Sequence, residues 1–556
     1  MAVIGVVGRR LAEGGAALAS NFRRPDLRRA QLAFGATYAG EWALTVALGV
    51  VAFRDGGATA VGIVALIRML PSALIAPFAT AVADRVRRDR VLIWIGVTRA
   101  AALGAAAVVM ALDLSAVFVY VLALIATIPF TAFRPAHSAL LPALCETPTE
   151  LTAANASRGL LDSASILVGP LLAALLLGIS GPEAVFVLIV GLSLWSALLV
   201  SLIDYEPAPR ETPPAPIRIA ADTADGLRAI AAQRDVTMLL GLAAVQALTR
   251  GALSVFTVVV AIELLETGEP GVGVLTAAVG IGAVVGSLGA SVLVGSRRLA
   301  AYTGVGIVMW GPPLALIGVF PAELFALVML AIVGAGNALV DLGYFTLFPR
   351  LMPDEVLARV FGALESLVAL AVGLGSIITP LLIHLFGIRG ALVAIGLMTP
   401  AVVALAWSRL VKVDEGLGAQ ADIIERLREV AMLRPLPVST IEHLARNVRE
   451  ESVEPGETVI EQGQVGDSFY VIVAGEVEVR ENGEVLRVLS DGDSFGEIAL
   501  LRDVPRTMTV RARTPVALYA LDGRHFVPTV SGYSESAAEA ETVVETRLAA
   551  SAARPV

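Results

Sequence analysis

Long apolar stretches, separated by short polar connections, fill the chain up to about residue 410. A helix needs about 20 mostly apolar residues to cross the hydrocarbon core of a bilayer. Windows that meet this requirement lie at residues 31–53, 59–83, 91–111, 115–135, 156–179, 182–203, 236–264, 271–294, 300–320, 322–348, 357–384 and 387–410. The pattern therefore predicts an all-α membrane domain with twelve transmembrane helices.

The composition agrees with a membrane protein, because hydrophobic residues make up 56% of the chain and charged residues only 16%. The net charge of −9 comes mostly from residues after 413 and contains no long run of one sign. We therefore predict no nucleic-acid partner. The single cysteine, Cys145, excludes an intramolecular disulfide and a thiolate metal cage, and we predict no metal site.

Arginine residues gather in alternate connections between the apolar stretches. The segment ahead of the first stretch and the second connection contain Arg9, Arg10, Arg23, Arg24, Arg28, Arg29, Arg85, Arg87, Arg88 and Arg90. The seventh connection carries only acidic charges, at Glu263, Glu266 and Glu269. Because cytoplasmic loops are enriched in Lys and Arg, an even number of spans places both termini in the cytoplasm. We expect a multi-pass protein of the cell (inner or plasma) membrane.

A proline-rich stretch at residues 206–216 interrupts the apolar pattern after the sixth span. The chain is therefore divided into a cytoplasmic lead-in, two six-helix halves, a central linker, a short second linker and a soluble domain. The lead-in occupies residues 1–30, the two halves residues 31–204 and 236–412, and the central linker residues 205–235. The second linker occupies residues 413–420 and the soluble domain residues 421–550. A repeat of six helices is typical of transporters.

The run TAVADRVRRDRVL, from Thr80 to Leu92, resembles the cytoplasmic loop motif of the major facilitator superfamily. Asp84, Arg85 and Arg88 match that motif, whereas Thr80 stands where the family has a glycine. The resemblance implies a 6+6 major facilitator fold, with the arginines holding the loop at the cytosolic face. Together with the sequence GEW at residues 40–42, it suggests the drug-efflux and secretion-effector branch.

Charged residues inside the predicted spans are candidates for the transport path, because an ionisable group is costly in the middle of a bilayer. Glu41, Arg250, Asp341 and Glu365 are the candidates; Arg68, Arg99 and Asp162 lie nearer the ends of their spans. In the functional interpretation Glu41, with Asp341 or Glu365, titrates and couples a proton gradient to substrate movement, opposite Arg250. In the structural alternative these residues form fixed interhelical pairs or reach the interface.

After Lys412 the pattern changes to short stretches of alternating apolar residues with glycines between them. Helical patterns at about 421–432 and 440–448 precede these stretches. Short strands separated by glycine turns predict a small soluble α+β domain, an antiparallel β-roll with flanking helices.

Within this domain the run FGEIALLRDVPRTM, from Phe495 to Met508, resembles the phosphate-binding cassette of cyclic-nucleotide-binding domains. Gly496 allows close approach of a ligand, and the helix that follows directs N–H groups towards a phosphate. Arg506 supplies a forked cation for the phosphate oxygens, and Glu497 accepts from the ribose hydroxyl. The cassette residues assigned to the site are Gly496, Glu497, Ile498, Ala499, Arg506 and Thr507.

The base of the nucleotide is harder to predict. Thr507 is compatible with guanine, but domains of this family that bind cAMP also carry threonine there; we favour cAMP narrowly and leave cGMP open. Val479 and Leu486 are expected to face the base. The helix around 537–550 is expected either to close as a lid or to pack as an ordinary helix. Many domains of this fold keep the roll and lose the ligand, usually together with the Glu or the Arg; this chain retains both.

The sequence contains no catalytic triad, Walker loop or catalytic carboxylate pair in a credible context, so we predict no enzyme and no covalent cofactor. The resemblance implies a secondary transporter, an exporter of small molecules, regulated by a cyclic nucleotide. Two alternatives stay open. One is a cyclic-nucleotide-sensing membrane receptor that transports nothing, and the other is a lysophospholipid flippase.

Overall fold

The computed structural model describes residues 23–85, 87–145, 147–205, 233–290, 293, 296–352 and 354–552. Most of the predicted lead-in and most of the central linker lie outside these residues. The chain divides into two compact units, Met1–Asp414 and Glu415–Val556. Each unit is described by itself.

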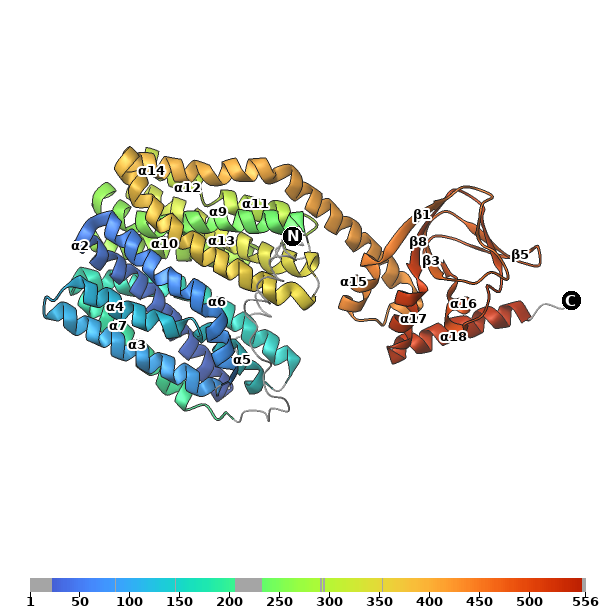
Figure 1. Ribbon diagram of the computed structural model, residues 1–556, viewed down its shortest axis with the longest axis horizontal. Coiled ribbons are helices and arrows are strands. Elements are labelled where there is room, and N and C mark those ends of the chain that lie inside the picture. Colours follow the sequence, from blue (N-terminus) through green and yellow to red (C-terminus); the bar gives the residue numbers. More distant parts are fainter. Residues whose placement is uncertain are drawn as a thin grey trace. The chain divides into compact units, whose positions relative to one another are not determined.

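The first unit is a bundle of helices that run side by side (Figure 1). Its helices are α2 (Pro25–Arg85), α3 (Arg88–Ala111), α4 (Ala116–Phe130), α5 (Phe133–Leu144), α6 (Pro148–Ile179), α7 (Pro182–Ser201), α9 (Arg234–Val259, continued by a π-helical turn at Val260–Leu264), α10 (Gly268–Ala290), α11 (Leu299–Val308), α12 (Pro312–Val319), α13 (Glu323–Leu351) and α14 (Asp354–Glu429). Strands are absent from its described part, as expected for a membrane domain built of helices.

Ten helices in the described residues are long and apolar enough to cross a membrane. The sequence predicted twelve spans, and the difference lies in α2 and α14, each of which contains two of the predicted spans. Both are interrupted by glycine backbone outside helical geometry, at Gly56–Gly57 and at Gly387. Gly57 and Gly387 have φ of 60° and 69°, a left-handed conformation that suits glycine. The chain therefore changes direction there with almost no loop between the spans.

Small residues let helices of the two predicted halves pack closely. Gly280 of α10 faces the backbone of α6, and a Cβ atom added there would lie 2.6 Å from the backbone nitrogen of Leu167. Such close approach is characteristic of helix packing in membranes. A buried apolar core containing Leu44, Phe186 and Phe256 runs through both halves.

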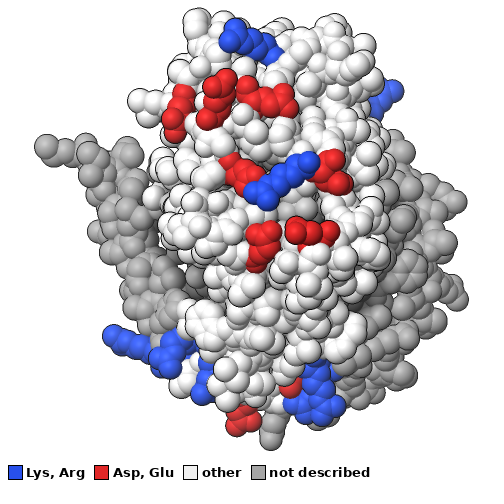
Figure 2. Space-filling view, turned by 90° about the vertical axis from the view of Figure 1, so that its left-hand side faces the viewer, with Lys and Arg blue, Asp and Glu red and all other residues white. Residues whose placement is uncertain are grey.

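Ion pairs tie connections together at the ends of the bundle. Arg54 of α2 pairs with Glu269 of α10 at 2.5 Å, which joins two connections that were both predicted to lie outside. Arg24 pairs with Glu150 at 2.8 Å, which joins two segments predicted to lie inside. Figure 2 shows that charged side chains are sparse on the face in view, where acidic groups gather around a few basic ones.

The second unit contains a β-roll and helices. Its elements after α14 are a 3-10 turn (Ala431–Leu433), α15 (Val438–Arg446), β1 (Val448–Val453), β2 (Thr458–Ile460), β3 (Ser468–Ala474), β4 (Val477–Glu481), β5 (Glu484–Leu489), β6 (Ser494–Phe495), α16 (Glu497–Arg502), β7 (Thr509–Ala512), β8 (Val516–Asp522), α17 (Gly523–Ser531) and α18 (Ser534–Ala552). The prediction of a small antiparallel β domain is confirmed.

The strands form two four-stranded antiparallel sheets, in the orders β1-β8-β3-β6 and β2-β7-β4-β5. Apolar side chains such as Ile472, Val479 and Leu518 form the core of the roll. A second core, which includes Phe469 and Phe526, packs α15, α17 and α18 against the first sheet. Both cores belong to the second unit.

Residues 413–420, which were predicted to connect the two domains, are helical and belong to α14. The apolar pattern of the last span ends near residue 410, so hydropathy alone places the end of the helix too early. The boundary between the two units falls within this segment, between Asp414 and Glu415.

Candidate functional site

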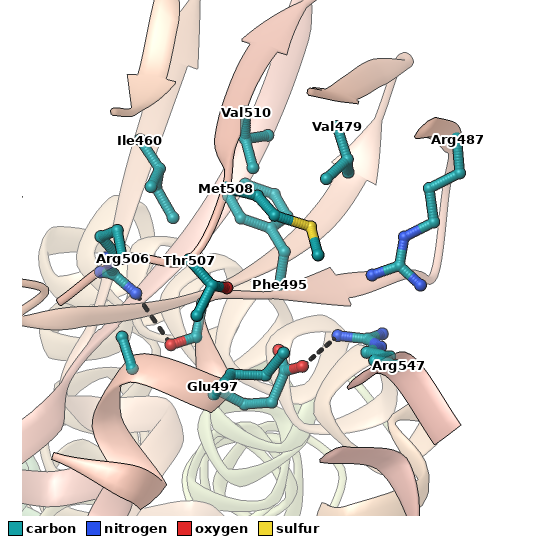
Figure 3. A pocket seen from close by; sticks show the side chains of 13 residues that line it. Ile460, Val479, Arg487, Phe495, Glu497, Arg506, Thr507, Met508, Val510 and Arg547 are labelled. Carbon is teal, nitrogen blue, oxygen red and sulfur yellow. Dashed lines mark hydrogen bonds and ion pairs between the residues drawn. The ribbon is translucent and has the colours of Figure 1, made fainter. Parts of the chain in front are cut away.

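A pocket lies in the β-roll between the second sheet, α16 and α18 (Figure 3). Its lining consists of Ile460, Val479, Arg487, Phe495, Gly496, Glu497, Ile498, Ala499, Arg506, Thr507, Met508, Val510 and Arg547. The predicted cassette residues therefore come together around one cavity.

Arg506 is held rigidly at one end of the pocket. Its guanidinium donates to the backbone oxygens of Gly496, at 2.8 Å, and Ser468, at 2.7 Å. Burial lowers the pKa of Arg506 from its ordinary value, while the nearby Tyr470 ring and acidic groups act in the opposite direction. A guanidinium stays charged under these conditions, so the pocket presents a fixed cation.

Glycine makes this placement possible. Gly496 has φ of +93°, and a Cβ atom there would lie 2.8 Å from an Arg506 nitrogen. Gly466 also lies against the Arg506 guanidinium, so a side chain at that position would displace it. These two glycines therefore shape the space in which the arginine sits.

Glu497 is the first residue of α16, and its side chain is only 1% exposed. Oε1 of Glu497 pairs with Nη1 of Arg547 at 2.6 Å. The other oxygen, Oε2, has no hydrogen-bond partner among the described residues. A buried carboxylate oxygen without a donor costs roughly 1–3 kcal/mol, so Glu497 can accept a hydrogen bond from a ligand hydroxyl.

The opposite wall is apolar and comes from strands of the second sheet and from β6. Ile460, Val479, Phe495, Met508 and Val510 supply it. An apolar wall beside a few fixed polar groups suits a ligand with a flat ring at one end and a charged group at the other.

The structure places Val479 in the pocket lining, but the lining residue from β5 is Arg487 instead of the predicted Leu486. Val479 is paired with Arg487, and the register shifts between Val479 and Arg480. A shift of one residue exchanges the faces of a strand. The prediction placed Leu486 by its position in the roll, and the bulge is not visible in the sequence.

Arg547 was not predicted to belong to the site. It lies on α18, the helix that was expected to act either as a lid or as a packing helix, and its side chain is 15% exposed. Its Nη1 contact to Glu497 shows that α18 covers one side of the pocket (Figure 3). The only hint in the sequence is a basic residue within one helical turn of the apolar Val543 and Val544.

In the first unit, Glu41 lies between two arginines. Its carboxylate pairs with Arg68, from the second segment of α2, and with Nη1 of Arg99 on α3 at 2.8 Å. Both arginines are buried, and Arg99 also lies over the Phe130 ring at 4.5 Å. This geometry is the fixed interhelical pairing that was considered as the alternative for Glu41.

The other three transport candidates are exposed, although they lie within helices of the bundle. Asp341 of α13 accepts a hydrogen bond from Asn337 at 2.9 Å and has Arg250 and Arg134 as charged neighbours. Glu365 is a charged neighbour of Arg134, which belongs to the other half. Asp341 and Glu365 thus share a charged neighbour, Arg134, that belongs to the other half.

Arg134 and Asp162 were not among the transport candidates, but they belong to the same charged region. Nη2 of Arg134 pairs with Asp162 at 2.5 Å, and its Nε donates to the Tyr38 hydroxyl at 3.0 Å. The sequence placed Asp162 near the start of a span and Arg134 at the end of the span predicted at 115–135, without assigning Arg134 a role. Both halves therefore contribute charge to this region.

Of the loop-motif residues, Arg88 donates from Nη1 to the backbone oxygen of Ala139 at 2.6 Å, which ties the start of α3 to α5. Such a bond fits the role that the resemblance implied for an arginine in this loop. The side chains of Asp84 and Arg85 lie outside the described residues, and their roles stay predictions.

The fold and the pocket together describe a protein with many apolar helices and a small antiparallel β domain that contains a cavity. The family model of the Major Facilitator Superfamily matches residues 32–375, more than half of the chain. The chain therefore belongs to this superfamily. The model of the cyclic nucleotide-binding domain matches residues 450–531.

The C-terminal domain is similar to parts of known kinase subunits. It is 43% identical over 97 residues to the cAMP-dependent protein kinase regulatory subunit of Yarrowia lipolytica, covering 17% of this chain and 26% of that protein. It is 35% identical over 115 residues to the type II regulatory subunit of Drosophila melanogaster, covering 21% and 30%. The chain thus spans less than a third of the length of these two relatives.

Among solved structures, the regulatory domain of Toxoplasma gondii PKA with cAMP matches with 27% identity and a TM-score of 0.20. That match covers 20% of this chain and 44% of the other.

Proposed function

We propose that this protein is a secondary transporter that exports small molecules and whose activity is regulated by a cyclic nucleotide bound in the C-terminal domain. The single observation that carries the regulatory part is the pocket in which Arg506 and the unpartnered Oε2 of Glu497 face the same cavity. A cyclic phosphate next to a ribose hydroxyl is the ligand that fits one fixed cation and one free carboxylate oxygen.

The transport part rests on the superfamily assignment and on charges that both halves contribute to one region. Glu41 is held between two guanidinium groups, whereas the Asp341 carboxylate accepts a bond from the neutral Asn337. We therefore assign proton uptake to Asp341, with Glu365 as its companion, and leave Glu41 a structural role. Arg250, beside Asp341, provides the opposing charge.

The proposed topology is twelve spans with both termini in the cytoplasm of the cell membrane. Pairing of Arg54 with Glu269 and of Arg24 with Glu150 supports it, because each pair joins connections predicted to lie on the same side. The C-terminal domain then faces the cytoplasmic pool of cyclic nucleotides.

Regulation would work by preferential binding. A nucleotide that binds one conformation of the C-terminal domain more tightly shifts the equilibrium towards the transporter state coupled to it. Glu497 connects the ligand to the fold, because the carboxylate that meets the ribose also holds Arg547 of α18. Entry of the ribose hydroxyl changes the partners of Glu497 and therefore the restraint on α18.

Calorimetric titration of the detergent-solubilised full-length protein with cAMP and cGMP tests the binding part. We expect one site for a cyclic nucleotide. Arg506→Gln or Glu497→Gln should weaken binding roughly 10- to 150-fold, the effect of losing a hydrogen bond to a charged group.

Arg513→Gln is the matched control, because Arg513 lies in the same domain, is mostly exposed, pairs with Glu476 and does not line the pocket. The affinity of the Arg513→Gln variant for the cyclic nucleotide should equal that of the unaltered protein. If neither nucleotide binds to the folded protein at millimolar concentration, the regulatory part of the proposal is wrong.

A further inference from the structure

Arg487 is a charged residue of the pocket to which the proposed function gives no role. It lies on β5, at the edge of the sheet β2-β7-β4-β5, directly opposite Val479. Figure 3 shows its guanidinium extending beside the apolar wall, on the side of the pocket away from Arg506. The pocket thus presents the Arg487 guanidinium on the side away from Arg506, in addition to the Arg547 guanidinium that pairs with Glu497.

The Arg487 guanidinium has no hydrogen-bond or ion-pair partner among the described residues. The charged groups around it are Arg547, Glu497 and Asp493; burial and Arg547 lower the pKa of Arg487, and the two acidic groups raise it. An arginine stays protonated in proteins and carries five N–H donors. Partly buried donors without acceptors are costly, so a ligand with acceptor atoms would be stabilised there.

The order of polar groups along the pocket follows the order of parts in a cyclic nucleotide. Arg506 lies at one end, Glu497 in the middle and Arg487 at the other end (Figure 3). With the phosphate on Arg506 and the ribose on Glu497, the base extends along Val479 and Met508 towards Arg487. Arg487 therefore meets the polar edge of the base.

The two purines differ at that edge. Guanine presents two acceptors, N7 and O6, which a guanidinium can bind with two parallel hydrogen bonds. Adenine presents N7 next to an amino group that is itself a donor and opposes an N–H of arginine. We propose that Arg487 recognises the base and that the pocket selects a cyclic guanine nucleotide over its adenine counterpart.

Thr507 supports the same selection. It lines the pocket beside Arg506, and its hydroxyl can accept a hydrogen bond from the 2-amino group of guanine, which adenine lacks. The selection rests on the proposed binding of a cyclic nucleotide and reverses the narrow preference for cAMP drawn from the sequence. The reversal follows from the β5 bulge, which places Arg487 in the position predicted for Leu486.

Titrations of the full-length protein with cGMP and with cAMP, under one set of salt and detergent conditions, test this selection. The unaltered protein should bind cGMP roughly 10- to 100-fold more tightly than cAMP, as expected for one bidentate contact. Arg487→Gln should lose that preference and favour cAMP, because glutamine pairs with N6 and N7 of adenine. Leu486→Ala is the matched control and should keep the ratio of the unaltered protein.

Arg487→Lys provides a second variant, which keeps the charge and loses the bidentate geometry; its preference for cGMP should fall. Size-exclusion profiles and unfolding temperatures establish that each variant is folded. Tighter binding of cAMP by the unaltered protein, or an unchanged ratio in Arg487→Gln, overturns the role of Arg487 while cyclic-nucleotide binding stands. Failure of both nucleotides to bind overturns the selection together with the proposed function.

Discussion

Individual charged residues in this protein are positioned by close partners, and Glu41 illustrates how much such partners matter. One carboxylate compensates two guanidinium groups, those of Arg68 and Arg99, and both arginines are buried among helices. Removing one partner of a buried ion pair is far more costly than the pair's own net contribution. A buried guanidinium therefore depends on its carboxylate.

Glu41→Gln should destabilise the protein by about 3–5 kcal/mol, because it leaves two buried cations without a counter-charge. Arg54→Gln is the control: the Arg54 side chain is 52% exposed and its pair with Glu269 is worth about 0–1 kcal/mol. Thermal unfolding in detergent compares the two. Equal unfolding temperatures for the two variants would contradict a structural role for Glu41.

At the scale of elements, α18 combines a packing surface with a contact to the ligand site. Ala540 and Val544 are buried, while Arg547 extends to the pocket and pairs with Glu497. A helix held by one ion pair at its pocket end can change its dynamics when that pair changes, because local opening depends on few interactions.

Arg547→Gln should therefore increase hydrogen exchange in the last two turns of α18 and leave the exchange of β3 unchanged. Arg502→Gln is the control, since Arg502 pairs with Glu541 on the same helix at an exposed position. Hydrogen-exchange mass spectrometry resolves these peptides. Identical exchange of α18 in both variants would show that Arg547 does not restrain the helix.

The sequence was sufficient where the relevant residues are contiguous. Gly496, Glu497 and Arg506 stand within one run, and their convergence on one pocket follows from the run itself. Arg547 lies 50 residues after Glu497, so only the tertiary structure brings it to the site. Leu486 and Arg487 are adjacent, and a bulge decides which of them lines the pocket. The apolar windows likewise placed interruptions at residues 54–58 and 385–386, at or next to the glycine breaks inside α2 and α14.

The whole molecule joins a transporter of the Major Facilitator Superfamily to a domain with a pocket for a cyclic nucleotide. Helix α14 contributes residues to both units, and Leu427 near its end is buried in a core of the second unit. Coupling requires that the nucleotide bind the transporter states with different affinity. In the proposed account, the distance between the two predicted halves reports which state is populated.

That distance can be measured with spin labels at Leu112→Cys and Phe320→Cys, one in each half, in a Cys145→Ser background. Leu112 and Phe320 are 63% and 60% exposed, so labels there should disturb the fold little. The measurement is pulsed electron–electron distance spectroscopy on the purified protein, with and without saturating cGMP, and with Arg506→Gln as the control that does not respond. We predict that the nucleotide shifts the distance distribution of the unaltered protein. An unchanged distribution in a protein shown to have bound the nucleotide would contradict the account.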